Sequence, residues 1–72
     1  MSMSRSYYRT YLLLQCTEKN ISNSTINAIM NLFGRLKSEQ KESIAQKAIP
    51  IVQRAKTEKE AYNKIKQLIE QA

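Results

Sequence analysis

Residues that could carry out acid–base, nucleophilic or metal chemistry are few in this chain of 72 residues. It contains no histidine, one cysteine and six acidic residues, all of them glutamate. A nucleophile needs a nearby base, and histidine is the usual one. The chain therefore lacks the usual base for nucleophilic catalysis. A zinc site needs several Cys or His ligands, and a glycine-rich phosphate loop needs more than the one glycine present. We therefore expect a protein that is not an enzyme, with no catalytic residue, no metal site, no cofactor and no small-molecule substrate.

The glutamates and the cysteine have simpler explanations than catalysis. Glu39 and Glu42 lie near the start of one expected helix, and Glu58 and Glu60 near the start of another. Carboxylates at these places stabilise the free N–H groups and the positive end of the helix dipole. Cys16 falls on the apolar face of an expected helix, where free cysteine usually behaves as a small hydrophobic residue. Both patterns predict structural roles.

Basic side chains outnumber acidic ones. Twelve Lys and Arg against six acidic residues give a net charge of +6. Such a charge favours acidic partners, including nucleic acid, anionic membrane surfaces and acidic proteins, although it also keeps a small protein in solution without any partner. The candidate contacts to a nucleic acid or an acidic partner are Arg5, Arg9, Arg35, Lys37 and Lys41.

Two DNA-binding motifs fit the chain poorly. A helix-turn-helix would place Gly34 in its turn and would need an apolar residue about six positions later, where Gln40 and Lys41 stand. A ribbon-helix-helix, with residues 5–15 as its strand, also needs apolar residues there. Nucleic acid could also be bound without either motif. Residues 5–11 interleave cations, which could contact phosphates, with aromatic rings, which could stack on bases.

The spacing of apolar residues predicts an all-α fold. Only one glycine and one proline are present, and apolar positions recur at helical spacing over residues 5–18, 24–36, 38–55 and 57–69. The first of these segments is also rich in aromatic residues, so a strand is the alternative there. We expect a single domain over residues 1–72, a small compact bundle of four amphipathic helices with near-antiparallel neighbours, and a disordered segment at residues 1–4.

Several residues mark where these helices begin and end. Ser22 or Ser24 could cap the second helix, and Gly34 could terminate it in the left-handed conformation. Residues 57–60 read as a capping box, with Thr at the cap and Glu three positions later. Pro50 falls inside the third helix, where it removes a backbone hydrogen bond, so we expect that helix to be kinked or split.

The first helix has more apolar residues than one buried stripe can hold. Seven of the ten residues from position 7 to position 16 are apolar or aromatic. A core this small should leave some of them exposed, and an exposed apolar patch marks an interface. The candidate interface residues are Tyr7, Tyr11, Leu13 and Leu14.

These patterns favour a non-enzymatic binding protein that acts by occupying a protein partner, as a regulator, an inhibitor or an adaptor. Self-association through the first helix would cover the same residues. The alternative is a small basic regulator that binds nucleic acid, DNA more readily than RNA, in monomeric or dimeric form.

The sequence also favours a cytoplasmic location, or the host cytoplasm for a viral protein. No run reaches the roughly 18 apolar residues that a membrane span requires. The start of the chain does not resemble a secretory signal, and a lone cysteine fits a reducing compartment.

Overall fold

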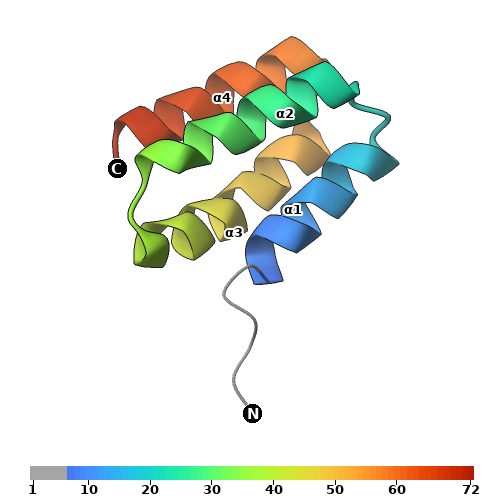
Figure 1. Ribbon diagram of the computed structural model, residues 1–72. Helices are drawn as coiled ribbons and strands as arrows, with labels where there is room; N and C mark the ends of the chain where they lie inside the picture. The colour runs from blue at the N-terminus through green and yellow to red at the C-terminus, as the bar shows by residue number, and fades with distance from the viewer. Residues whose placement is uncertain (1–6) are drawn as a thin grey trace.

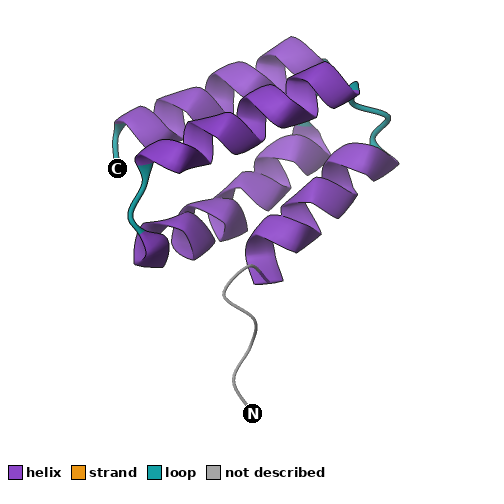
Figure 2. Ribbon diagram, in the orientation of Figure 1, coloured by secondary structure: helices purple, strands orange, loops and turns teal. Residues whose placement is uncertain are grey.

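The computed structural model describes residues 7–72 as helices joined by short connections. In chain order these are α1 (Tyr7–Glu18), α2 (Asn23–Leu32), the short 3₁₀ helix η1 (Phe33–Arg35), α3 (Ser38–Arg54) and α4 (Glu58–Glu70). Within these residues only helix and loop are present (Figure 2). The expected all-α fold is confirmed, and the first segment is helix rather than strand. The expectations for residues 1–4 and for Arg5 lie outside the described residues.

The helices form two layers, with α1 beside α3 in one and α2 beside α4 in the other (Figure 1). Within each layer the two helices run in the same direction. Two hydrogen bonds show that α1 and α3 are parallel. Tyr8 contacts Glu42 near the starts of the two helices, and Gln15 contacts Gln53 near their ends. Helices that follow one another along the chain run in opposite directions, as the expectation of near-antiparallel neighbours has it, whereas the two side-by-side pairs are parallel (Figure 1). Parallel packing is possible because the helix between each pair carries the chain back.

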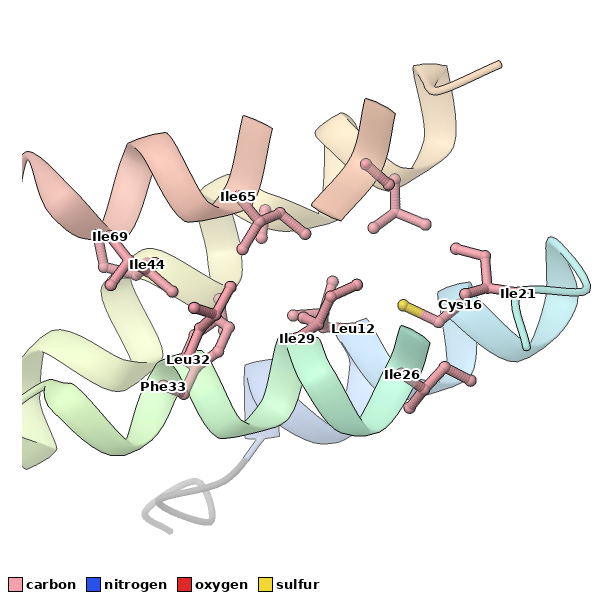
Figure 3. Packing of buried hydrophobic residues seen from close by; sticks show 14 of the residues in the cluster. Leu12, Cys16, Ile21, Ile26, Ile29, Leu32, Phe33, Ile44, Ile65 and Ile69 are labelled. Atoms are coloured by element: carbon pink, nitrogen blue, oxygen red, sulfur yellow. The ribbon is translucent and has the colours of Figure 1, made fainter. Parts of the chain in front are cut away.

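The core lies between the layers and receives side chains from all four helices. Leu12 and Cys16 of α1, Ile29 of α2, Val52 of α3 and Ile65 of α4 are its largest fully buried members. Figure 3 shows Cys16 at one end of the core, and Ile29 and Ile65 further along. The remaining buried residues are Ile21, Ile26, Leu32, Phe33, Ile44, Ala45, Ala48, Ala55, Ala61 and Ile69.

The end of α2 differs from the expectation. The helix ends at Leu32 and continues as the tighter helix η1, which closes with a hydrogen bond from the Leu36 N–H to the Phe33 carbonyl (3.1 Å). Gly34 lies inside η1 and does not have a positive φ. The left-handed residue is instead Asn20 (φ 59°), just after α1, and asparagine tolerates this conformation better than most residues.

Pro50 does not divide α3. The helix runs without interruption from Ser38 to Arg54, so the expectation of two short helices is wrong, and a bend at Pro50 stays a prediction. Proline has no N–H to donate to the carbonyl of Gln46. Ala48 and Val52, on either side of it, are fully buried and hold both halves of the helix to one core.

Two helix starts are capped by their own residues. Ser22, rather than Ser24, caps α2 by accepting a hydrogen bond from the Thr25 N–H (3.4 Å). Thr57 caps α4 by accepting one from the Glu60 N–H (3.1 Å). The expected capping box is half present, because the Glu60 carboxylate accepts from the N–H of Lys56 (3.5 Å) and not from that of Thr57.

A second cap joins α2 to α4. The first turn of α2 contains no acidic residue, and Glu58 of α4 supplies one. Its carboxylate accepts hydrogen bonds from the Thr25 hydroxyl (2.7 Å), the Ser22 hydroxyl (2.8 Å) and the Ser22 N–H (3.1 Å). These bonds, that of Thr25 first, lower the pKa of Glu58. They also fix the starts of two parallel helices side by side.

Leu12 and Leu14 allow a direct test of which face of α1 supports the fold. Leu12 is fully buried and Leu14 is 53% exposed. We expect Leu12→Ala to lower the free energy of unfolding by about 3 kcal/mol, because it leaves a cavity, and Leu14→Ala to change it by less than about 0.5 kcal/mol. Urea denaturation of both variants measures this, and equal losses would contradict the burial described here.

The cap made by Glu58 predicts an acid-dependent contribution to stability. Because its pKa is lower in the folded protein than its ordinary value of 4.5, the carboxylate stabilises the fold above that pH. This contribution is lost as the pH falls through the folded pKa. We expect the stability difference between the wild type and Glu58→Gln to be full at pH 7 and to shrink below pH 4.5.

Thr25→Val serves as the matched variant for this experiment. It removes the strongest donor to Glu58 while keeping the carboxylate, and should weaken the same acid dependence in part. Thermal melts across the acid range measure both. A stability difference for Glu58→Gln that stays constant down to the lowest pH at which the protein folds would contradict the assignment.

Candidate interaction surface

Helix α1 carries apolar side chains on two opposite faces. With 3.6 residues per turn, Leu12 and Cys16 fall on one side of the helix, while Tyr7, Tyr11 and Leu14 follow one another along the other side. Leu12 and Cys16 are fully buried against the core. In this respect α1 departs from the expectation of an amphipathic helix, whose second face would be polar.

The second face of α1 is exposed. Tyr7, Tyr11, Leu13 and Leu14 are between 41% and 53% exposed, and they are the large apolar side chains that remain exposed among residues 7–72. Leu13 flanks the stripe formed by the other three. We call these four residues the outer face of α1. They are the same four that the sequence singles out as a candidate interface.

The outer face of α1 presents few polar groups. Thr10 and Thr17 lie among its four members, and no charged residue occurs on this side before Glu18, the last residue of the helix. The Thr17 hydroxyl donates a hydrogen bond to the backbone carbonyl of Leu13 (3.1 Å), so it is already satisfied within the helix. The polar atoms that Tyr7 and Tyr11 add are their two phenol hydroxyls. The surface is therefore apolar and uncharged as far as Glu18 at its end.

The aromatic ring at one end of this surface is held by its neighbour. The rings of Tyr7 and Tyr8 meet edge to face, with centroids 4.9 Å apart and an angle of 82° between their planes. Tyr8 is half-buried and packs against the core cluster. Because edge-to-face contacts stabilise both rings, Tyr8 restricts the orientation of the exposed Tyr7 ring.

The first turn of α1 is attached to α3 by one carboxylate. Glu42 of α3 accepts a hydrogen bond from the Tyr8 N–H at Oε1 (2.7 Å) and one from Arg9 Nε at Oε2 (2.8 Å). Like α2, α1 has no acidic residue in its own first turn. Glu42 thus satisfies an otherwise unpaired helix N–H and neutralises Arg9, holding α1 with its outer face away from the core.

The thiol behind this surface is shielded from solvent. Cys16 is fully buried, and its burial raises the pKa of the thiol because the charged thiolate would lose its hydration. Among residues 7–72, no group of three Cys, His, Asp or Glu side chains is placed to hold a metal ion. Within the same residues, no helix has the length and apolar composition needed to cross a membrane.

Comparison with other proteins does not assign this chain to a family. No family model, curated protein or solved structure matches it. The geometry of the chain itself is therefore the basis for its functional interpretation.

The five cations singled out from the sequence do not form one basic patch. Arg9 pairs with Glu42, and Arg9 and Lys41 line a depression that also contains Glu39 and Glu42, so positive and negative charges alternate there. The other predicted contacts are placed differently. Arg35 and Lys37 are exposed in and after η1, and Arg5 lies outside the described residues.

Sequence reasoning did not identify Glu42 as the residue that positions the outer face. It assigned Glu42 to the start of its own helix, whereas its carboxylate serves the start of another helix 34 positions earlier in the chain. One signal was present in the sequence. Between Tyr7 and Thr17 there is no acidic residue, so the expected first helix lacks a carboxylate for its free N–H groups.

The contact between Glu42 and α1 can be tested by substitution. We expect Glu42→Ala to lower the free energy of unfolding by about 1 kcal/mol, because the Tyr8 N–H loses its acceptor and Arg9 loses its partner. Hydrogen exchange at the first turn of α1 should become faster than in the wild type. Glu39→Ala is the control, since Glu39 is an exposed glutamate three positions before Glu42 on the same helix. Equal effects of the two variants would contradict the positioning role of Glu42.

Proposed function

We propose that this chain is a non-enzymatic binding protein that acts by occupying a protein partner through the outer face of α1. The observation that carries the proposal is the concentration of the exposed large apolar side chains, in the described part of the chain, on one side of one helix. Scattered single apolar residues are normal on a protein surface, whereas a contiguous group of this kind is typical of an interface.

The energetics of the outer face support a protein partner. Covering the exposed part of each tyrosine or leucine side chain contributes on the order of 1 kcal/mol. The backbone under these side chains is already helical and is held by Glu42, so little conformational entropy is lost on binding. Tyr7 and Tyr11 add rigid aromatic area with a polar hydroxyl, a combination that is enriched at binding hot spots.

The same surface does not favour nucleic acid as the occupant. Phosphate recognition needs cations, and the outer face of α1 has none. A complementary surface would instead be an apolar groove with acceptors for two phenol hydroxyls. By occupying such a groove the protein would regulate, inhibit or link its partner, while its net charge of +6 would speed the approach to an acidic target.

Site-specific photo-cross-linking in the cells from which the gene comes tests this proposal. A benzophenone amino acid at position 14, on the outer face, should give one cross-linked product with a distinct protein. The same group at position 31, an exposed position of α2 outside this face, should give none. Replacing Tyr11 with Ser should abolish the product, because it removes apolar area from the interface centre without touching the core.

The purified complex should then form with one copy of each protein and show the same dependence on Tyr11. Products from both positions, or from neither, would contradict the proposal. A product containing only this chain would replace the partner with a second copy and would equally contradict it.

A further inference from the structure

A second surface lies between α3 and α4, away from the outer face of α1. A shallow groove there is lined by Pro50, Ile51, Arg54 and Lys64. Lys47 is exposed one turn before Pro50 and Ile51 on α3. Lys47 and Arg54 are seven residues apart, so about 10 Å of helix separates them on the same side of α3. We call these five residues the α3–α4 groove.

The floor of this groove is apolar and partly open. Pro50 and Ile51 are both half-buried. Their side chains bury one part against the protein and leave another part open. The open part is apolar surface that a ligand can cover.

The rim of the groove keeps its positive charge because two carboxylates of α3 and α4 are bound to the starts of other helices. Glu42 binds the start of α1, and Glu58 binds the start of α2. Glu60 borders the groove and pairs with Lys64 (3.2 Å), while its other oxygen accepts from the Lys56 N–H. Arg54 and Lys47 form no ion pair with any residue between positions 7 and 72. Arg54 and Lys47 are thus available to an acidic ligand, while Lys64 is held by Glu60.

The apolar floor decides which acidic ligand fits. A single-stranded nucleic acid would use the cations but would need aromatic side chains on which to stack its bases, and none lines the groove. A duplex would pair its phosphates with the cations and leave the apolar floor uncovered. The aromatic side chain of α4, Tyr62, lines a different depression on the side of α2. An acidic peptide uses both parts of the groove, since an apolar side chain can cover Pro50 and Ile51 while carboxylates reach the cations.

We propose that the α3–α4 groove binds an acidic peptide segment of a protein, in which carboxylates flank one apolar side chain. The apolar side chain packs on Pro50 and Ile51, and the carboxylates pair with Arg54 and Lys47. This site is independent of the outer face of α1 and does not require it. With both surfaces occupied, the protein joins two partners and acts as an adaptor.

Fluorescence anisotropy with a short labelled peptide, in which glutamates flank a central leucine, tests the groove on the full chain. The double variant Lys47→Glu/Arg54→Glu should raise the Kd about tenfold, because two ion pairs are lost and replaced by repulsion. The matched control is Arg35→Glu/Lys59→Glu, which has the same net charge and alters exposed residues outside the groove. It should change the Kd by less than about twofold, since its charges are distant and screened.

Three further measurements complete this test. A peptide with serine in place of the central leucine should bind about tenfold more weakly, because it leaves the floor uncovered. Leu14→Gln, on the outer face of α1, should leave peptide binding unchanged, which separates this test from that of the proposed function. Circular dichroism melts establish that every variant is folded.

Several outcomes would overturn the proposal. These are no binding of the peptide, equal effects of the two double variants, equal binding of the serine peptide, and loss of binding in Leu14→Gln. Random duplex DNA serves as the competing probe. If it binds more tightly than the peptide and depends on Lys47 and Arg54, nucleic acid is the occupant and the peptide proposal fails.

Discussion

A core one layer thick is the constraint on which the rest of this structure depends. Each helix meets the core along one side, so each can bury one stripe of side chains. Helices α2, α3 and α4 supply one such stripe each, whereas α1 carries two. Burying Leu12 and Cys16 therefore places Tyr7, Tyr11 and Leu14 at the surface. The apolar outer face follows from the size of the fold together with the composition of one helix.

The carboxylates that cap helix starts also determine where positive charge remains on the surface. Three of the six glutamates accept hydrogen bonds from backbone N–H groups near helix starts, two of them on a different helix. These contacts neutralise the junctions between the helices. The lysines and arginines on the outer sides of α3 and α4 consequently have few acidic neighbours, and one structural requirement produces both the stable junctions and the basic rim of the α3–α4 groove.

Local features of the structure could be predicted from the sequence, and those that depend on helix pairing could not. Helical spacing and capping residues predicted four helices, the Thr57 cap and the excess apolar surface of the first helix. The parallel pairing of α1 with α3, and the transfer of Glu42 and Glu58 to other helices, depend on contacts between residues more than 30 positions apart. Gly34 was misjudged because η1 closes without a left-handed residue, and α3 is not split at Pro50 because packing on both sides outweighs one lost bond.

The two caps that cross between helices have a consequence for synthesis on the ribosome. The start of α1 is completed by a residue of α3, and the start of α2 by a residue of α4. When the first half of the chain emerges, its two helix starts still lack these carboxylates, and isolated helices this short are marginal in water. The helices of the first half therefore depend on the second half for their stability. We therefore expect α1 to become stable only after α3 has left the exit tunnel, and α2 only after α4 has begun to emerge.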